Sequence, residues 1–229
     1  TPMKIESFPR KLFLFRNNLC MFAQTQNELH NMKHMSILAV SLLALVACTP
    51  EKKQEADYSQ YVNPMIGTDF TGNTYPGAQV PFGMVQLSPD NGLPGWDRIS
   101  GYFYPDTTIA GFSHTHLSGT GAGDLYDISF MPVTRPYKEA PAPLGIYSTF
   151  SHNDEAASAG YYRVLLKDYN INVELTATER CGIQRYTFPE AEASVFLNLK
   201  KAMNWDFTLD SKIEVVDSTT IRGYRLSQG

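Results

Sequence analysis

The chain has 229 residues, of which 43 % are hydrophobic and 18 % are charged, so it can bury a substantial core. Its formal net charge is −4. Residues 1–47 contribute a charge of +3, from five basic and two acidic side chains, which leaves −7 for the remainder. An acidic remainder makes nucleic acid a poor partner and suits a neutral ligand, such as a sugar, or a cation.

The first 47 residues read as processing signals rather than as part of a fold. Residues 1–31 begin with Thr1 and sustain neither a helical nor a strand period, which predicts a non-native upstream extension, although a short amphipathic piece within it is an alternative. Met32 is the expected start. Residues 37–47 (ILAVSLLALVA) form an apolar run that is too short for a membrane span of roughly 20 residues. We therefore predict a signal peptide at 32–47.

The signal peptide ends in Leu-Val-Ala-Cys, which resembles a bacterial lipoprotein box. This resemblance implies that Cys48 carries lipid and anchors the exported protein to the bacterial cell envelope. An ordinary secretory signal with a chance cysteine is the alternative. Residues 48–60 are charged and form the predicted flexible tether. Cys181 is the one cysteine after this tether, so we expect a small buried side chain and no disulfide there.

The stretch from Tyr61 to Pro132 is dense in glycine, proline and aromatic residues. Glycines let the backbone take positive φ and let other groups approach closely. Aromatic rings and imidazoles add flat faces and hydrogen-bonding edges. Ordered loops of this composition usually line a binding cleft. The alternative is a set of tight turns between short strands, plugged by aromatic side chains.

After this loop-rich stretch the pattern is that of short strands. Residues 171–178 (INVELTAT) alternate between apolar and polar side chains, which predicts a half-buried strand. Residues 168–170 read as a short hairpin connection. We expect further strands at 127–134, 161–167, 182–188, 193–199, 212–216 and 219–224. Many short strands without a long helical stripe predict an all-β fold, an antiparallel β-sandwich over residues 61–229.

Several polar residues are candidates for a metal site or for substrate binding. His114 and His116, with Asp124 and Asp127 nearby, suggest a metal site, because histidines two apart on a strand share a face. Their spacing matches no common zinc pattern, so a structural or sugar-contacting role is favoured. The glycine-rich loop at 119–123 lacks the lysine of a phosphate loop. Turn capping is the expected role of the aspartates, and structural ion pairs that of Arg98 and Arg163.

Trp96 follows Pro94-Gly95, which predicts a turn with an accessible indole ring. Exposed indoles stack on the C–H faces of sugars. The alternative is a core tryptophan beneath a loop. Trp96, Asp97, His114 and His116 are the candidate substrate-binding residues; we assign no catalytic residue and no metal ligand.

The order of the motifs adds a resemblance. VNPMIGT, TYPGAQVPFGMVQLSPD, GWD, SGY, GFSHTHLSGTG, GDLYDISFMP and ELTATERCGIQRYTFP resemble the N-terminal domain of glycoside hydrolase family 92. The resemblance implies a calcium-dependent, inverting exo-α-mannosidase that acts on mannose-containing glycans. It also implies that this β-sandwich pairs with a catalytic (α/α)6 barrel, which supplies the catalytic carboxylates and most calcium ligands and is not encoded before Gly229.

In that family, a tryptophan in the GWD block packs against the leaving sugar of α-1,2 linkages, which is the role implied for Trp96. Two alternatives stay open. One is a free-standing surface carbohydrate-binding module without catalysis, and the other is a purely structural domain.

Overall fold

The computed structural model describes residues 56–142, 144–200 and 206–228. Residues from Ala56 onward form one unit by themselves. The predicted upstream extension, the signal peptide and Cys48 lie outside the described residues. Only the end of the predicted tether, residues 56–60, is described, and it is exposed. The described residues contain no α-helix, and no helix among them is long and apolar enough to cross a membrane.

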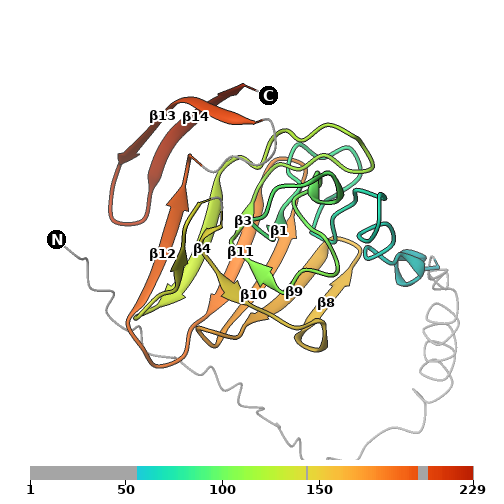
Figure 1. Ribbon diagram of the computed structural model, residues 1–229, viewed down its shortest axis with the longest axis horizontal. Helices are drawn as coiled ribbons and strands as arrows, with labels where there is room; N and C mark the ends of the chain where they lie inside the picture. The colour runs from blue at the N-terminus through green and yellow to red at the C-terminus, as the bar shows by residue number, and fades with distance from the viewer. Residues whose placement is uncertain (1–55, 143, 201–205, 229) are drawn as a thin grey trace, which may run out of the picture. The chain divides into compact units, whose positions relative to one another are not determined.

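One sheet is a meander of four consecutive strands. These are β8 (Glu155–Ser158), β9 (Tyr161–Leu166), β10 (Ile171–Ala177) and β11 (Gly182–Thr187), in the order β11-β10-β9-β8. All neighbours are antiparallel (Figure 1). In β10 the predicted alternation is confirmed, because every second side chain from Ile171 to Ala177 is buried.

The second sheet joins strands that are distant in sequence. It consists of β1 (Ser88–Asp90), β3 (Gly111–Ser113), β4 (Ser129–Thr134) and β12 (Ala193–Asn198), in that order. The β4–β12 register aligns Thr134 with Ala193 and Ser129 with Asn198. Two short pairs flank the sheets: β2 (Thr108–Ile109) with β7 (Ser148–Thr149), and β5 (Glu139–Ala140) with β6 (Gly145–Ile146).

The core lies between the two sheets. Inward side chains of the second sheet, such as Phe112 and Val133, join those of the meander, such as Val164 and Val173, in one apolar cluster. Each large apolar side chain buried in this way contributes about 1.5–3 kcal/mol. Two antiparallel sheets packed over one core form the predicted β-sandwich, so the all-β fold class is confirmed.

The loop-rich stretch of 61–132 combines both roles that its composition allowed. Tyr75, Tyr102 and Tyr126 are buried and act as aromatic plugs. Trp96 and Phe82 are exposed. The loops are therefore packed against the sandwich through buried rings and present other aromatic rings at their outer surface.

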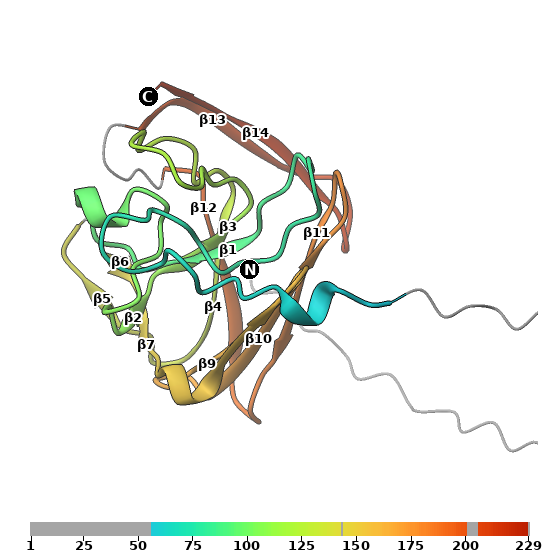
Figure 2. The ribbon, with the colours of Figure 1, turned by 90° about the vertical axis from the view of Figure 1, so that its right-hand side faces the viewer.

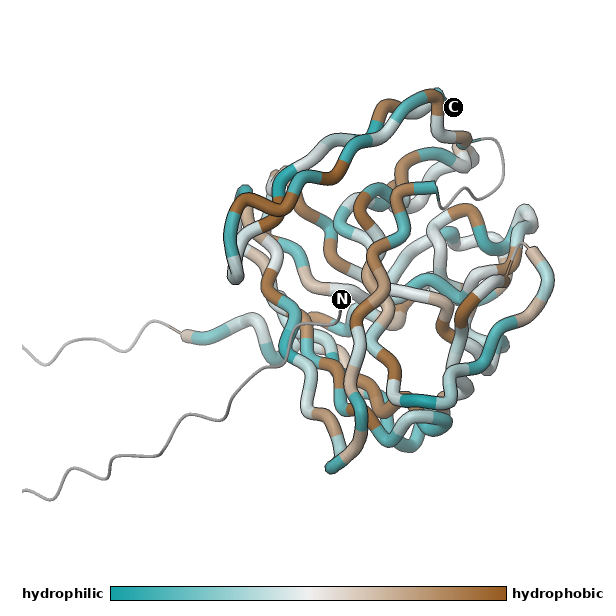
Figure 3. Tube along the Cα trace, turned by 90° about the vertical axis from the view of Figure 1, so that its left-hand side faces the viewer, coloured by the Kyte–Doolittle hydropathy of each residue, from teal (hydrophilic) through white to brown (hydrophobic). Residues whose placement is uncertain are grey.

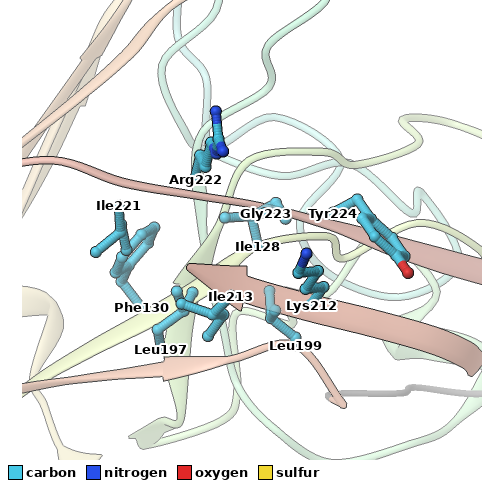
Figure 4. Close-up of a pocket in the computed structure, with 10 residues that line it drawn as sticks. All are labelled: Ile128, Phe130, Leu197, Leu199, Lys212, Ile213, Ile221, Arg222, Gly223 and Tyr224. Carbon is cyan, nitrogen blue, oxygen red and sulfur yellow. The ribbon is translucent and has the colours of Figure 1, made fainter. Parts of the chain in front are cut away.

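A long hairpin follows the sandwich. Strands β13 (Phe207–Val215) and β14 (Ile221–Gln228) are longer than predicted, and Asp217 caps their turn by accepting bonds from Thr219. Apolar and polar residues alternate along it, as the brown and teal segments near the C-terminus show (Figure 3). Its apolar face and the β4–β12 face enclose a cavity of about 410 Å³, lined by Phe130, Leu197, Ile213 and Ile221 among others (Figure 4). The hairpin is thus incompletely packed against the sandwich.

Cys181 corrects one expectation. It lies in the turn between β10 and β11 and is exposed, with no disulfide, rather than buried as a small hydrophobe. Its position explains the difference. The turn is closed by main-chain bonding of Thr178 to the Cys181 carbonyl and by a bond from the Cys181 amide to the Thr178 hydroxyl. A residue in so tight a turn at the sheet end has no core to enter.

Candidate functional site

Trp96 opens a single 3-10 turn, η2 (Trp96–Arg98), that follows Pro94-Gly95. The turn is closed by the Arg98 amide, which donates to the Gly95 carbonyl over 3.1 Å. The side chain of Trp96 has 58 % relative exposure, so the predicted accessible ring is observed, and a core position is ruled out. A large exposed indole on an ordered turn offers a flat apolar surface on which a ligand can stack.

The glycine-rich loop holds the ring from one side. A Cβ built on Gly121 would lie 3.1 Å from Trp96 Cη2, which is closer than ordinary van der Waals contact. The backbone at Gly121 therefore lies close to the indole edge, and a larger residue there would require the ring to shift. The sequence alone predicts this glycine-rich loop but not its contact with Trp96, because nothing in the spacing of residues 96 and 121 relates them.

A bidentate ion pair also stabilises this turn. Arg98 Nε and Nη2 donate to the two carboxylate oxygens of Asp106 over 2.7 and 2.5 Å. The guanidinium also lies over the Phe103 ring, 4.7 Å from its centroid. The hydrogen bond to Asp106 raises the pKa of Arg98 above its ordinary value. The predicted structural ion pair of Arg98 is confirmed, and it fixes the residue two positions after Trp96.

A second loop supports the glycine-rich loop. The Gly119 amide donates to the Asn73 carbonyl over 2.6 Å. Asn73 has a φ of 51° and is 7 % exposed, and its Oδ1 atom has no hydrogen-bond partner among the described residues. Asparagine tolerates this left-handed conformation better than most residues do. The sequence signal for this position is the Gly72-Asn73 pair, which predicts a turn but not its contact with Gly119.

A buried pair, Asp90 and His116, links strand β1 to the segment before the glycine-rich loop. His116 Nε2 lies 2.9 Å from Asp90 Oδ1, and His116 Nδ1 lies 2.7 Å from the Gln86 carbonyl oxygen. The Ser113 hydroxyl donates to Asp90 Oδ2 over 2.8 Å. Gly101 has a φ of 89° and leaves no room for a Cβ, which would lie 2.7 Å from Asp90 Oδ1. The pair therefore fastens the loops to the sandwich.

The two histidines do not share a ligand-facing surface, which corrects the expectation drawn from their spacing. Strand β3 ends at Ser113, so neither residue is in a strand. His116 is 3 % exposed, with both ring nitrogens next to protein oxygens. His114 Nδ1 instead donates to the Ile128 carbonyl over 2.9 Å, and its ring packs against Phe130. Burial lowers the pKa of His114, although the bond to Ile128 opposes this.

With this geometry established, the chain can be compared with known proteins. The family model described as "Glycosyl hydrolase family 92 N-terminal domain" matches residues 61–229. The chain belongs to glycoside hydrolase family 92.

Solved structures agree with the family 92 assignment. A family GH92 alpha-mannosidase from Bacteroides thetaiotaomicron, in complex with mannoimidazole, is 42 % identical with a TM-score of 0.70, over 75 % of this chain and 23 % of its own. A family GH92 inverting mannosidase from Bacteroides thetaiotaomicron VPI-5482 is 28 % identical with a TM-score of 0.60, over 77 % of this chain and 24 % of its own.

A curated relative gives a similar coverage. An uncharacterized secreted glycosidase from Arthroderma benhamiae is 26 % identical over 172 residues, which are 71 % of this chain and 21 % of the relative. The chain thus spans about a quarter or less of the length of the relatives it matches.

Three further aspartates of this family 92 domain bond to other protein groups. Asp127 accepts from the Thr115 hydroxyl over 2.9 Å and forms an ion pair with Arg225. Arg225 also pairs with Asp206, whose pKa is raised by burial. Asp124 accepts from the next amide, as a turn aspartate does. Asp97, beside Trp96, is half-buried.

No group of three or more histidine, cysteine, aspartate or glutamate side chains in the described ranges is arranged to hold a metal ion.

Proposed function

We propose that this chain forms the N-terminal side of the active-site cleft of an inverting exo-α-mannosidase, selective for α-1,2 linkages in mannose-containing glycans. Membership of family 92 supports the enzyme class. Trp96 carries the proposal for the site, because its exposed ring stands on a turn fixed by the Arg98–Asp106 pair and by Gly121. Its indole would form one wall of the subsite that holds the leaving sugar.

The chemistry assigned to this domain is binding and orientation. A sugar face laid on the indole removes apolar surface from water, at about 25 cal/mol per Å². Asp97, the next residue in the chain, is half-buried, and its carboxylate would accept hydrogen bonds from sugar hydroxyls. His116 supports the site indirectly, by holding the loops through Asp90. We keep a sugar contact for His114 as a prediction, although its visible partners are Ile128 and Phe130.

The carboxylates that perform hydrolysis are assigned to the rest of the polypeptide. An inverting glycosidase needs an acid and a base roughly 6.5–9.5 Å apart with water between them. The better-placed aspartates of this chain are already used, Asp106 by Arg98 and Asp90 by Ser113 and His116. We therefore expect the chain on its own to release no mannose, and to act in contact with a C-terminal catalytic barrel.

The proposal also covers the origin of the calcium ligands and the attachment of the protein to the membrane. Calcium ligands would come mainly from the rest of the polypeptide, and no step is routed through calcium here. We propose export through residues 32–47 and lipidation at Cys48, which would tether the enzyme to the bacterial cell envelope. The description of the curated relative as secreted is consistent with export.

The test is Trp96→Ala in the full-length enzyme, with two substrates. A stacking contact contributes roughly 1–3 kcal/mol, so kcat/KM on α-1,2-mannobiose should fall about 10- to 100-fold. An aryl mannoside lacks the leaving sugar and should be affected much less. The melting temperature should stay near that of the wild type, since the ring is exposed.

Equal losses on both substrates would count against the subsite role. A wild-type full-length protein that binds mannosides without cleaving them would instead favour the second candidate function, a surface carbohydrate-binding module, for which the exposed Trp96 is equally suited.

A further inference from the structure

The outer face of the β8–β11 sheet carries polar side chains in cross-strand rows. In the middle rows these groups satisfy one another. The Glu174 carboxylate accepts from the Tyr161 hydroxyl over 2.7 Å and from Nε and Nη2 of Arg185, and Arg163 stands directly opposite Glu174 in the register. The Thr176 hydroxyl donates to the Gly160 carbonyl over 2.9 Å. This part of the face is a closed polar surface.

The row at the end of the sheet differs. Asn172 stands between Leu165 and Thr187 in the register, next to the turn that contains Asn170. The 3-10 turn η3 (His152–Asp154) adds Asn153 and Asp154. Together with Arg163, Phe188 and Pro189, these residues line a hollow of about 470 Å³. A hollow of this volume is within the range of small-molecule sites.

Three asparagines line this hollow, of which Asn153 and Asn170 are exposed and Asn172 is partly buried. Among the residues that the structure describes, no hydrogen bond is made by the side chains of Asn153, Asn170 or Asn172. Three amides that line one hollow without protein partners contrast with the mutually bonded rows beside them. Each amide offers donors and an acceptor at once, which matches the dual character of a hydroxyl group.

The charges and the apolar residues narrow the ligand class. Arg163 and Asp154 carry opposite charges, and Lys167 Nζ lies 3.8 Å from Asp154, so the hollow has no strong excess of either sign. Leu165, Phe188 and Pro189 give it apolar surface. Amides, one charge of each sign and an apolar patch suit a neutral, polyhydroxylated ligand better than a phosphate or a carboxylate.

We propose that this hollow is a second, non-catalytic binding site for neutral saccharides. It is separate from the Trp96 site. The hollow is bordered by η3, which is the gold turn at the bottom of Figure 2, whereas η2 is the green turn at upper left. A site on the outer sheet face leaves the loop surface free, so the domain would hold one part of a glycan while another part occupies the cleft. This inference does not depend on the proposed role of Trp96.

The experiment is a titration of the whole chain with mannose and with α-1,2-mannobiose, followed by amide chemical shifts. We expect millimolar binding that shifts amides at the ends of β9, β10 and β11. Asn172→Val removes the central amide but keeps a strand-forming side chain, and it should weaken that binding about 10-fold or more. Thr176→Val, on the same strand and face but outside the hollow, is the matched control and should bind like the wild type.

Trp96→Ala distinguishes the two sites and should leave these shifts unchanged. Three results would overturn the proposal: no shifts at these strand ends in the wild type, equal binding by Asn172→Val, or loss of the shifts in Trp96→Ala. Far-ultraviolet dichroism of every variant checks that the sheet is intact, and Arg163→Met provides a second variant in the hollow if Asn172→Val does not fold.

Discussion

The Nε2 atom of His116 lies 2.9 Å from Oδ1 of Asp90, and neither side chain has any exposed surface. The two residues are 26 positions apart in the sequence. Asp90 ends strand β1, whereas His116 belongs to the loop that leads to the glycine-rich segment. The pair therefore bonds the loop that carries His116 to the strand at the edge of the sandwich.

Asp90→Ala should destabilise the domain strongly. Removal of one partner from a buried, hydrogen-bonded pair leaves the other without its compensation, which costs about 3–5 kcal/mol. Urea unfolding followed by tryptophan fluorescence measures this. Asp57→Ala is the control, because Asp57 is exposed and its carboxylate accepts from the nearby Ser59 amide, so its loss should change stability little. Similar stabilities of the two variants would contradict a structural role for the pair.

Gly121→Ala should displace the Trp96 ring without unfolding the domain. The added methyl group would lie 3.1 Å from Cη2 of the indole, and an exposed ring can move to avoid it. We expect kcat/KM of the full-length enzyme on a mannobiose to fall about 10-fold, with little change in melting temperature. At Gly119, which has a φ of 66°, an alanine meets no neighbour, so Gly119→Ala should cost stability of about 1 kcal/mol instead.

The Arg98–Asp106 clamp should show measurable coupling. Both side chains are largely buried and the contact is bidentate, so a double-mutant cycle of Arg98→Ala and Asp106→Ala should give about 0.5–2 kcal/mol. Arg98→Lys should not restore it, because an ammonium cannot match both oxygens. If the effects of the two single substitutions on the free energy of unfolding were additive, the pair would not contribute to stability.

His114 should make stability depend on pH. Burial lowers its folded-state pKa below the unfolded value of about 6.5. Above that value the ring is neutral in both states. As the pH falls below it, the unfolded chain takes up a proton that the folded state resists, so stability declines until the folded ring also titrates. His114→Gln, which can still donate to Ile128, should flatten this decline in urea unfolding at a series of pH values. An unchanged slope would contradict it.

Cys48 is the remaining prediction, and it lies outside the described residues. Labelling with a fatty-acid analogue in a bacterial host should mark the wild type and not Cys48→Ala. Several acyl chains anchor a protein firmly, whereas one binds only marginally, so the wild type should also fractionate with membranes. Absence of label from both proteins would reject the lipoprotein signal.

The regular strands were predictable because their alternation is local. INVELTAT shows its buried face directly, and the hairpin at Asp168-Tyr169-Asn170 joins neighbouring strands. The ion pair of Arg98 was expected, but its partner Asp106 was not. Contacts between distant segments escaped prediction, as with Gly121 against Trp96 and Asp90 against His116, since each depends on how the loops fold back. The predicted burial of Cys181 was wrong because it rested on the residue type and not on the position of Cys181 in a tight turn.

The different connectivity of the two sheets also sets an order of folding. Strands β8 to β11 are consecutive, so closing their short loops costs little entropy, and the meander can form as soon as Thr187 has been synthesised. Strand β4 must wait for β12, because Thr134 pairs with Ala193 far along the chain. During that interval, Met131 and Val133 lack a completed sheet. We therefore expect the nascent chain to be most prone to aggregation after β4 and before β12 emerges, which is the window in which a holding chaperone would act.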